Sequence, residues 1–149
     1  MKLEHLVQAY KINNVNVELE DMSNENEKAG VIKFCNGIAA SYLLDEEQIV
    51  VAIKIFCNCI TSDKPSIENQ INYVLNIINI MQQTMMLLSN IPQKECILIL
   101  ESLGLFNGTF KEEKQIKHLD HIYSIQLIDN LICLSVTEEL QGPPVKSQD

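Results

Sequence analysis

The chain contains no arginine and no tryptophan, and aromatic residues make up only 5% of its 149 positions. Lysine supplies all eleven of its Lys and Arg positions, against twenty acidic residues, so the formal net charge is −9. Nucleic-acid binding requires a basic patch that usually contains arginine, and two-pronged recognition of phosphate or carboxylate is the task that arginine performs best. The composition argues against both, and it suits a well-solvated surface or a partner protein with a basic face.

Long apolar runs and glycine-rich loops are also missing. Asn, Gln or Lys interrupts every apolar run before it reaches membrane-spanning length, and charged residues are spaced through the start of the chain. The five glycines form no pattern that would cradle a phosphate. We therefore expect no membrane insertion, no secretory signal and no nucleotide site.

The cysteines are odd in number and mostly embedded in apolar runs. Thiols of this kind behave as small core residues in a reducing compartment, which predicts a cytoplasmic protein. The five are Cys35, Cys57, Cys59, Cys96 and Cys133.

The first part of the chain combines one short helix with extended segments. The spacing of Leu3, Leu6, Val7 and Tyr10 predicts an amphipathic helix from Leu3 to about Ile12. A brief extended run follows over 15–21, and then a polar loop over 22–30. Three apolar runs between Gly30 and Thr61, separated by turn residues, predict three antiparallel strands. The third run is dense in β-branched residues, which favours a strand over a helix.

A central helix is predicted over residues 65–90, and its apolar residues are not confined to one face. A helix that is apolar on nearly all sides is buried on both sides, and in so short a chain we expect the second cover to be a partner subunit. One face carries Ile67, Ile71, Val74, Leu75 and Ile78, and Ile77, Ile80 and Met81 point elsewhere.

Residues 84–106 allow two interpretations. The central helix either continues to Leu88 or breaks near Thr84, in which case strands follow at 85–90 and 95–106. Pro92 excludes a continuous helix through this point. We adopt the strand interpretation, because apolar residues occupy both faces of the second segment: Ile97, Leu98, Ile99 and Leu100.

The last part of the chain reads as a long amphipathic helix over residues 110–140. Thr109 and Glu112 have the spacing of a capping box, and a Pro/Gly-containing tail over 141–149 is expected to be disordered. One helical face carries Ile116, Leu119, Tyr123, Leu127, Leu131 and Leu134.

The predicted order is helix, three strands, helix, two strands, helix (α-β-β-β-α-β-β-α). This order is typical of an α+β domain in which helices cover an antiparallel sheet. Residues 1–140 are expected to form this single domain.

Few residues suggest chemistry. His118 and His121 have a spacing that would let them share a metal on a helix, but solvated histidines are the simpler interpretation. The pair Cys57-x-Cys59 lacks the usual two-residue spacer and a second pair, which favours buried thiols over a zinc or redox site. The acidic run Asp45–Glu47 is best explained as a solvated turn. We expect no catalytic residue, no metal site and no cofactor.

The predicted order resembles that of the class I type III secretion chaperones of Gram-negative bacteria. The similar stretches are residues 15–21 and 30–56 as a three-strand meander and its lead-in, 65–80 as the central helix, 95–106 as the last strand and 110–140 as the final helix. The likeness is one of pattern and spans residues 3–140.

The resemblance implies a non-catalytic homodimer in the bacterial cytoplasm. Such a chaperone holds the N-terminal segment of a secreted effector protein in an extended, secretion-competent form, by strand addition and side-chain pockets. Apolar positions select an effector groove at Leu3, Leu6, Val7, Tyr10, Val31 and Phe34. They select a dimer interface at Val74, Ile77, Ile80, Met81, Ile97 and Ile99.

Two other functions remain open. An acidic immunity or inhibitor protein that neutralises a basic toxin fits the size and charge equally. It would form a stoichiometric complex with a folded protein, whereas a chaperone would keep an unfolded client in solution. A small metal-dependent enzyme rests only on His118 and His121 and would require bound metal.

Overall fold

The computed structural model describes residues 1–34, 37–58, 67–106, 113–129 and 131–139, and the side chains of 67–71 are not described. Three helices and seven strands follow one another along this part of the chain. In order they are α1 (Leu3–Ile12), β1 (Glu18–Asp21), β2 (Lys28–Lys33), β3 (Ala39–Leu44), β4 (Val50–Asn58), α2 (Ile67–Ser89), α3 (Gln93–Ser102), β5 (Lys114–His118), β6 (His121–Ile128) and β7 (Leu131–Glu138).

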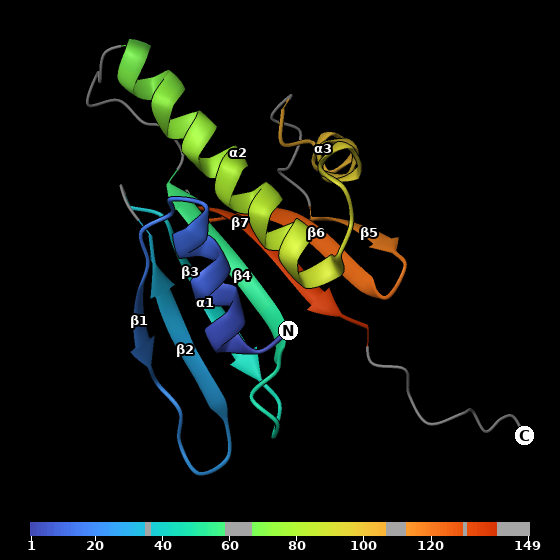
Figure 1. Ribbon diagram of the computed structural model, residues 1–149. Coiled ribbons are helices and arrows are strands. Elements are labelled where there is room, and N and C mark those ends of the chain that lie inside the picture. Colours follow the sequence, from blue (N-terminus) through green and yellow to red (C-terminus); the bar gives the residue numbers. More distant parts are fainter. Residues whose placement is uncertain (35–36, 59–66, 107–112, 130, 140–149) are drawn as a thin grey trace, which may run out of the picture.

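All seven strands form one antiparallel sheet in the order β1-β2-β3-β4-β7-β6-β5. The sheet consists of two meanders, β1–β4 and β5–β7, which are joined where β4 pairs with β7. Figure 1 shows α1, α2 and α3 on the same face of this sheet. The predicted α+β class with an antiparallel sheet is therefore confirmed.

The core lies between this helical layer and the sheet. Alternation explains the strand side of the core: Ile53, Ile55 and Cys57 of β4 are buried, and Lys54 between them is exposed. The largest fully buried side chains are Tyr10, Tyr123, Leu6, Ile32, Ile38, Ile53, Ile55, Met81, Met85, Leu100, Leu103 and Ile125.

The three strands predicted between Gly30 and Thr61 correspond to β2, β3 and β4. The extended run over 15–21 adds a fourth strand, β1, because Glu18–Asp21 pair with Lys33–Gly30 of β2. The predicted order was one strand short at this point.

The predicted strand at 85–90 is wrong, because α2 continues to Ser89. Met and Leu, which dominate this stretch, are strong helix formers. The Thr84 hydroxyl donates to the Ile80 carbonyl oxygen at 2.7 Å, so this polar side chain is satisfied within the helix. The helix ends at Ser89, and the next residue, Asn90, has a φ of 54°, the left-handed conformation typical of the residue that follows a helix.

The predicted strand at 95–106 is also wrong, because residues 93–102 form α3. Pro92 caps the new helix and does not mark a β-turn. Burial follows helical spacing at Cys96, Ile99 and Leu100, whereas Leu98 between them is 53% exposed. The apolar run at 97–100 fits a strand with two buried faces, but it forms part of a short helix that buries only one face.

The predicted C-terminal helix is the largest error, because β5, β6 and β7 occupy residues 114–138. Tyr123 and Ile125 are buried at alternate positions of β6, and Leu134 and Val136 do the same in β7. The helical spacing of leucines was coincidental: Leu119, on its predicted buried face, is 68% exposed. The Thr109–Glu112 capping box, Cys35, Cys59 and the tail at 141–149 lie outside the described residues.

Leu119 adopts a backbone conformation that is unfavourable for a leucine. It forms the β5–β6 turn with Asp120, and its φ is 55°. The left-handed conformation costs a non-glycine residue about 1 kcal/mol, and asparagine tolerates it better than leucine. Leu119→Asn is therefore expected to raise the free energy of unfolding by about 0.5–1 kcal/mol, measured by urea unfolding. Leu43→Asn, which replaces an exposed leucine within β3, should give no increase; an equal gain in both variants would contradict the explanation.

Candidate functional site

The residues predicted to form an effector groove do not share one surface. Leu6 and Tyr10 are fully buried on the inner side of α1, and Leu3, Val7 and Phe34 are half-buried. Tyr10 and Phe34 do meet, with ring centroids 5.2 Å apart in an edge-on arrangement. Val31 lies on the opposite face of the sheet, because its strand neighbours Gly30 and Ile32 face the helices.

Tyr10 instead joins two helices inside the core. Its hydroxyl forms a buried hydrogen bond with Thr84 of α2, and Thr84 in turn donates to the Ile80 carbonyl oxygen. The Tyr10 hydroxyl is therefore the donor in the first bond. Burial raises the pKa of Tyr10 well above its usual value, so the phenol stays neutral.

The residues predicted for a dimer interface mostly lie inside the chain. Ile77, Ile80, Met81 and Ile99 are buried, and Ile97 is half-buried. The second apolar side of α2 is covered by α3 of the same chain, where the Gln93 amide donates to Gln82 Oε1 at 3.1 Å. The first described turns of α2 extend past the sheet in Figure 1 and expose Val74 and Leu75, at 40% and 56%. Near the other end of the helix, Met86 is 38% exposed.

The two histidines face each other across the β5–β6 hairpin and are not on a helix. His118 Nε2 lies 3.0 Å from Glu95 Oε2 of α3, so this ring links the hairpin to the helical layer. Burial lowers the pKa of His121, although the carboxylates of Glu138 and Asp120 act in the opposite direction. Within the described residues, no three His, Cys, Asp or Glu side chains come close enough to hold a metal ion.

The three cysteines that the structure describes are in buried positions: Cys57, Cys96 and Cys133. Burial raises the pKa of Cys96 to about 11 and raises that of Cys133 as well. Because the thiolate is the nucleophile, such thiols react slowly.

Alkylation with iodoacetamide at pH 8, followed by peptide mass spectrometry, should therefore label Cys96 and Cys133 at least ~100-fold more slowly in the folded protein than in urea. The unfolded chain is the control, since the same thiols are then exposed. Labelling of the folded protein at the unfolded rate would contradict the buried positions of both thiols.

The second face of the sheet carries no helix in the described part of the chain, and we call it the open face. Alternation places Phe56, half-buried, and Leu43, 41% exposed, on it. Strand register brings further apolar side chains beside them, namely Val31, Ala39, Ala52, Ile122, Ile128 and Leu131. A polar row crosses the middle of the face, formed by Ser41, Lys54, Ser135 and Gln115. Cys133 and Ser124 are on the same side of the sheet but are buried. The open face is thus a mixed surface of the kind found at protein interfaces.

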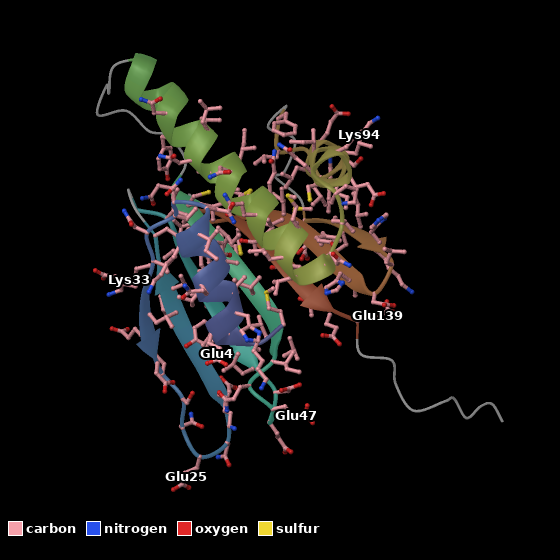
Figure 2. The ribbon with its side chains drawn as sticks, viewed as in Figure 1. Glu4, Glu25, Lys33, Glu47, Lys94 and Glu139 are labelled. Atoms are coloured by element: carbon pink, nitrogen blue, oxygen red, sulfur yellow. The ribbon has the colours of Figure 1, made fainter. Side chains whose placement is uncertain are left out.

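Acidic residues gather at one end of the sheet. The β1–β2, β3–β4 and β5–β6 turns, the start of α1 and the end of β7 all lie at this end, and Figure 2 shows Glu25 and Glu47 there. We call this the acidic end. It contains Glu4, Asp21, Glu25, Glu27, Asp45, Glu46, Glu47, Asp120, Glu138 and Glu139. Its lysines are Lys2, Lys28 and Lys117, so the negative charge is unevenly distributed over the molecule.

Two signals in the sequence mark the strands of the open face. Phe56 and Lys54 alternate with buried residues, which marks the outer side of β4. Asp129, followed by Asn130, is a turn signal between β6 and β7, and it would have divided the supposed last helix.

Comparison of the chain with protein-family models, with curated proteins and with solved structures finds no match. None of the helices in the described ranges is long and apolar enough to cross a membrane.

Proposed function

We propose that this chain is a non-catalytic protein-binding domain and that its partner packs against the open face. The observation that carries the proposal is the one-sided cover of a seven-stranded sheet. Leu43 and Ile128 remain about two-fifths exposed on the uncovered side, and Phe56 lies there between two small register partners, Ala39 and Cys133. A surface of this kind, in which apolar side chains are interleaved with serines and with Lys33, Lys54 and Lys117, is typical of a docking face.

An effector chaperone of the type III secretion class is one specific form of this proposal. The acidic charge and the apolar binding surface support it, and the buried cysteines support a location in the bacterial cytoplasm. The final helix on which the resemblance depended is replaced by β5–β7, so we propose the broader function, protein binding, as the conclusion.

In-cell photo-crosslinking tests the open face directly. A photoreactive phenylalanine analogue placed at Leu43 should give a discrete adduct with a partner protein, because this side chain projects from the open face. The control position is Ile12, which is 72% exposed at the end of α1. An adduct from Leu43 but not from Ile12 is expected. No adduct from either, or equal adducts from both, would contradict the proposal, and an adduct with a second copy of the chain would identify a homodimer.

A second candidate is an acidic inhibitor that neutralises a basic toxin. The acidic end favours it, since a dense cluster of carboxylates accelerates association with a basic protein. The same crosslinker at Glu46, in the β3–β4 turn, should then capture a folded basic protein, and the yield should fall steeply with added salt. Capture from Leu43 that does not depend on salt would favour the first function.

A further inference from the structure

β1 is one edge of the sheet, and all four of its residues are exposed. In an antiparallel pair, residues that exchange main-chain hydrogen bonds alternate with residues that do not. The Met22 N–H donates to the Ala29 carbonyl oxygen at 2.9 Å, one step beyond the pair Asp21 and Gly30. Glu18 and Glu20 are therefore bonded to β2, whereas the main-chain groups of Leu19 and Asp21 point outward.

The charge of this edge is negative. Glu18, Glu20 and Asp21 are three of its four residues. Glu20 forms a weak, exposed ion pair, with its Oε1 3.9 Å from Lys33 Nζ. Glu18 and Glu20 project on the side of the open face, and Leu19 and Asp21 project on the helical side. A strand added here would meet carboxylates on one side and, beside Leu19, an apolar position on the other.

A hollow of about 520 Å³ adjoins the first residue of β1. Its apolar lining is Val17 and Phe34, and its polar lining is Asn16, Glu18, Lys11 and Lys33, so an apolar side chain suits it better than a basic one. A side chain at the end of an added strand would have room to enter it. The hollow thus extends the edge in the direction that an added segment would follow.

We propose that β1 receives an extended segment of a partner protein by strand addition, and that this segment alternates basic with apolar side chains. Basic residues would face Glu18 and Glu20, and apolar residues would lie beside Leu19 and towards the hollow. The inference rests on the proposed protein-binding function and adds a second contact to it.

A second copy of this chain is a poorer occupant. The opposite edge, β5, contains basic residues, but Lys117 Nζ lies 2.9 Å from Glu139 Oε1 and His118 is paired with Glu95. Two copies would also each have a net charge of −9. Both facts favour a basic segment from a different protein.

The test uses the full chain and a fluorescent peptide of about eight residues in which lysine and valine alternate. Fluorescence anisotropy should detect binding to the wild type, and a peptide with glutamate in place of lysine should not bind. Glu18→Lys with Glu20→Lys should weaken binding about 10-fold or more, because two cross-strand attractions become repulsions. Glu46→Lys with Glu47→Lys makes the same charge change in the β3–β4 turn, so it should weaken binding no more than about twofold.

Leu19→Pro tests strand addition separately from charge. Proline removes a main-chain N–H that points outward, and an edge strand tolerates it there. Binding should fall about 10-fold relative to Leu19→Ala, which retains the N–H, and the circular dichroism spectrum of both variants should match the wild type. In the complex, the amides of Leu19 and Asp21 should exchange hydrogen more slowly. Unchanged exchange in the presence of bound peptide would overturn strand addition even if the proline variant failed to fold.

The two proposals fail in different ways. Equal weakening by both lysine pairs, or equal binding by Leu19→Pro and Leu19→Ala, would overturn the strand-addition site and leave the open face untouched. If no adduct forms from Leu43 but the peptide still binds at β1, the open-face proposal would be overturned and the strand-addition site would stand. Pairing of β1 with β5 of a second copy would appear as concentration-dependent assembly in light scattering, and it would overturn the choice of partner.

Discussion

Leu6→Ala is expected to lower the free energy of unfolding by about 3 kcal/mol. The Leu6 side chain is fully buried between α1 and the sheet, so truncation removes apolar contacts and leaves a cavity that the packed core fills only in part. The effect is large for a domain of this size, whose total stability is expected to be about 5–15 kcal/mol. Urea unfolding followed by circular dichroism measures it.

The control is Leu43→Ala, which removes the same atoms from an exposed position on the open face. It should change stability by less than about 0.5 kcal/mol. If Leu6 instead belonged to a partner-binding groove, Leu6→Ala would affect binding and leave stability close to that of the wild type. Equal stability losses in the two variants would mean that the burial assigned to Leu6 is wrong.

Gly30→Ala is expected to destabilise the protein by about 2–4 kcal/mol, because β2 has no room for a side chain there. A Cβ at Gly30 would stand 2.5 Å from Tyr42 Cζ and 2.6 Å from the Glu20 carbonyl oxygen, and still closer to the Tyr42 hydroxyl. The Tyr42 ring is buried, and the carbonyl belongs to the backbone of β1, so neither can move without cost.

A double-mutant cycle separates the two clashes. Tyr42→Leu shortens the side chain that covers Gly30, so the penalty of Gly30→Ala should be smaller in that background than in the wild type. Ala29→Ser, at the neighbouring position of β2, should be nearly neutral and serves as the control. An unchanged penalty in the Tyr42→Leu background would show that the strain comes from β1 alone. A near-neutral Gly30→Ala would contradict the close packing of this hairpin.

Prediction from sequence succeeded where local pattern and fold agree. Residues 39–58 alternate cleanly and are rich in β-branched side chains, so β3 and β4 were found. Prediction failed where apolar residues are dense, because Ile97–Leu100 fit either a strand with two buried faces or a helix packed on one side. The helix is favoured by the packing of α3 against α2, and a short stretch of sequence does not contain that contact.

The C-terminal half failed for a related reason. Leucines at helical spacing coincided with positions that belong to the strands β5, β6 and β7. These strands join the rest of the sheet through β7, which pairs with β4 more than seventy residues earlier in the chain. Because these strands were not predicted, the open face was not predicted either. The open face exists only once β6 and β7 join β4, whereas the first helix, chosen as a groove, is held in the core by Tyr10 and Leu6.

The junction of β4 with β7 has a consequence for the order in which the molecule can fold. Every other strand pair joins neighbours in the chain, but Ala52 must meet Thr137 across 85 intervening steps of sequence (137 minus 52). Such a closure is slow relative to hairpin formation. During synthesis β1–β4 can therefore assemble first and leave one side of β4 unpaired until β7 emerges. That temporary edge carries the run Val50–Phe56, whose single charge is Lys54, so this lysine is placed to discourage pairing with other nascent chains.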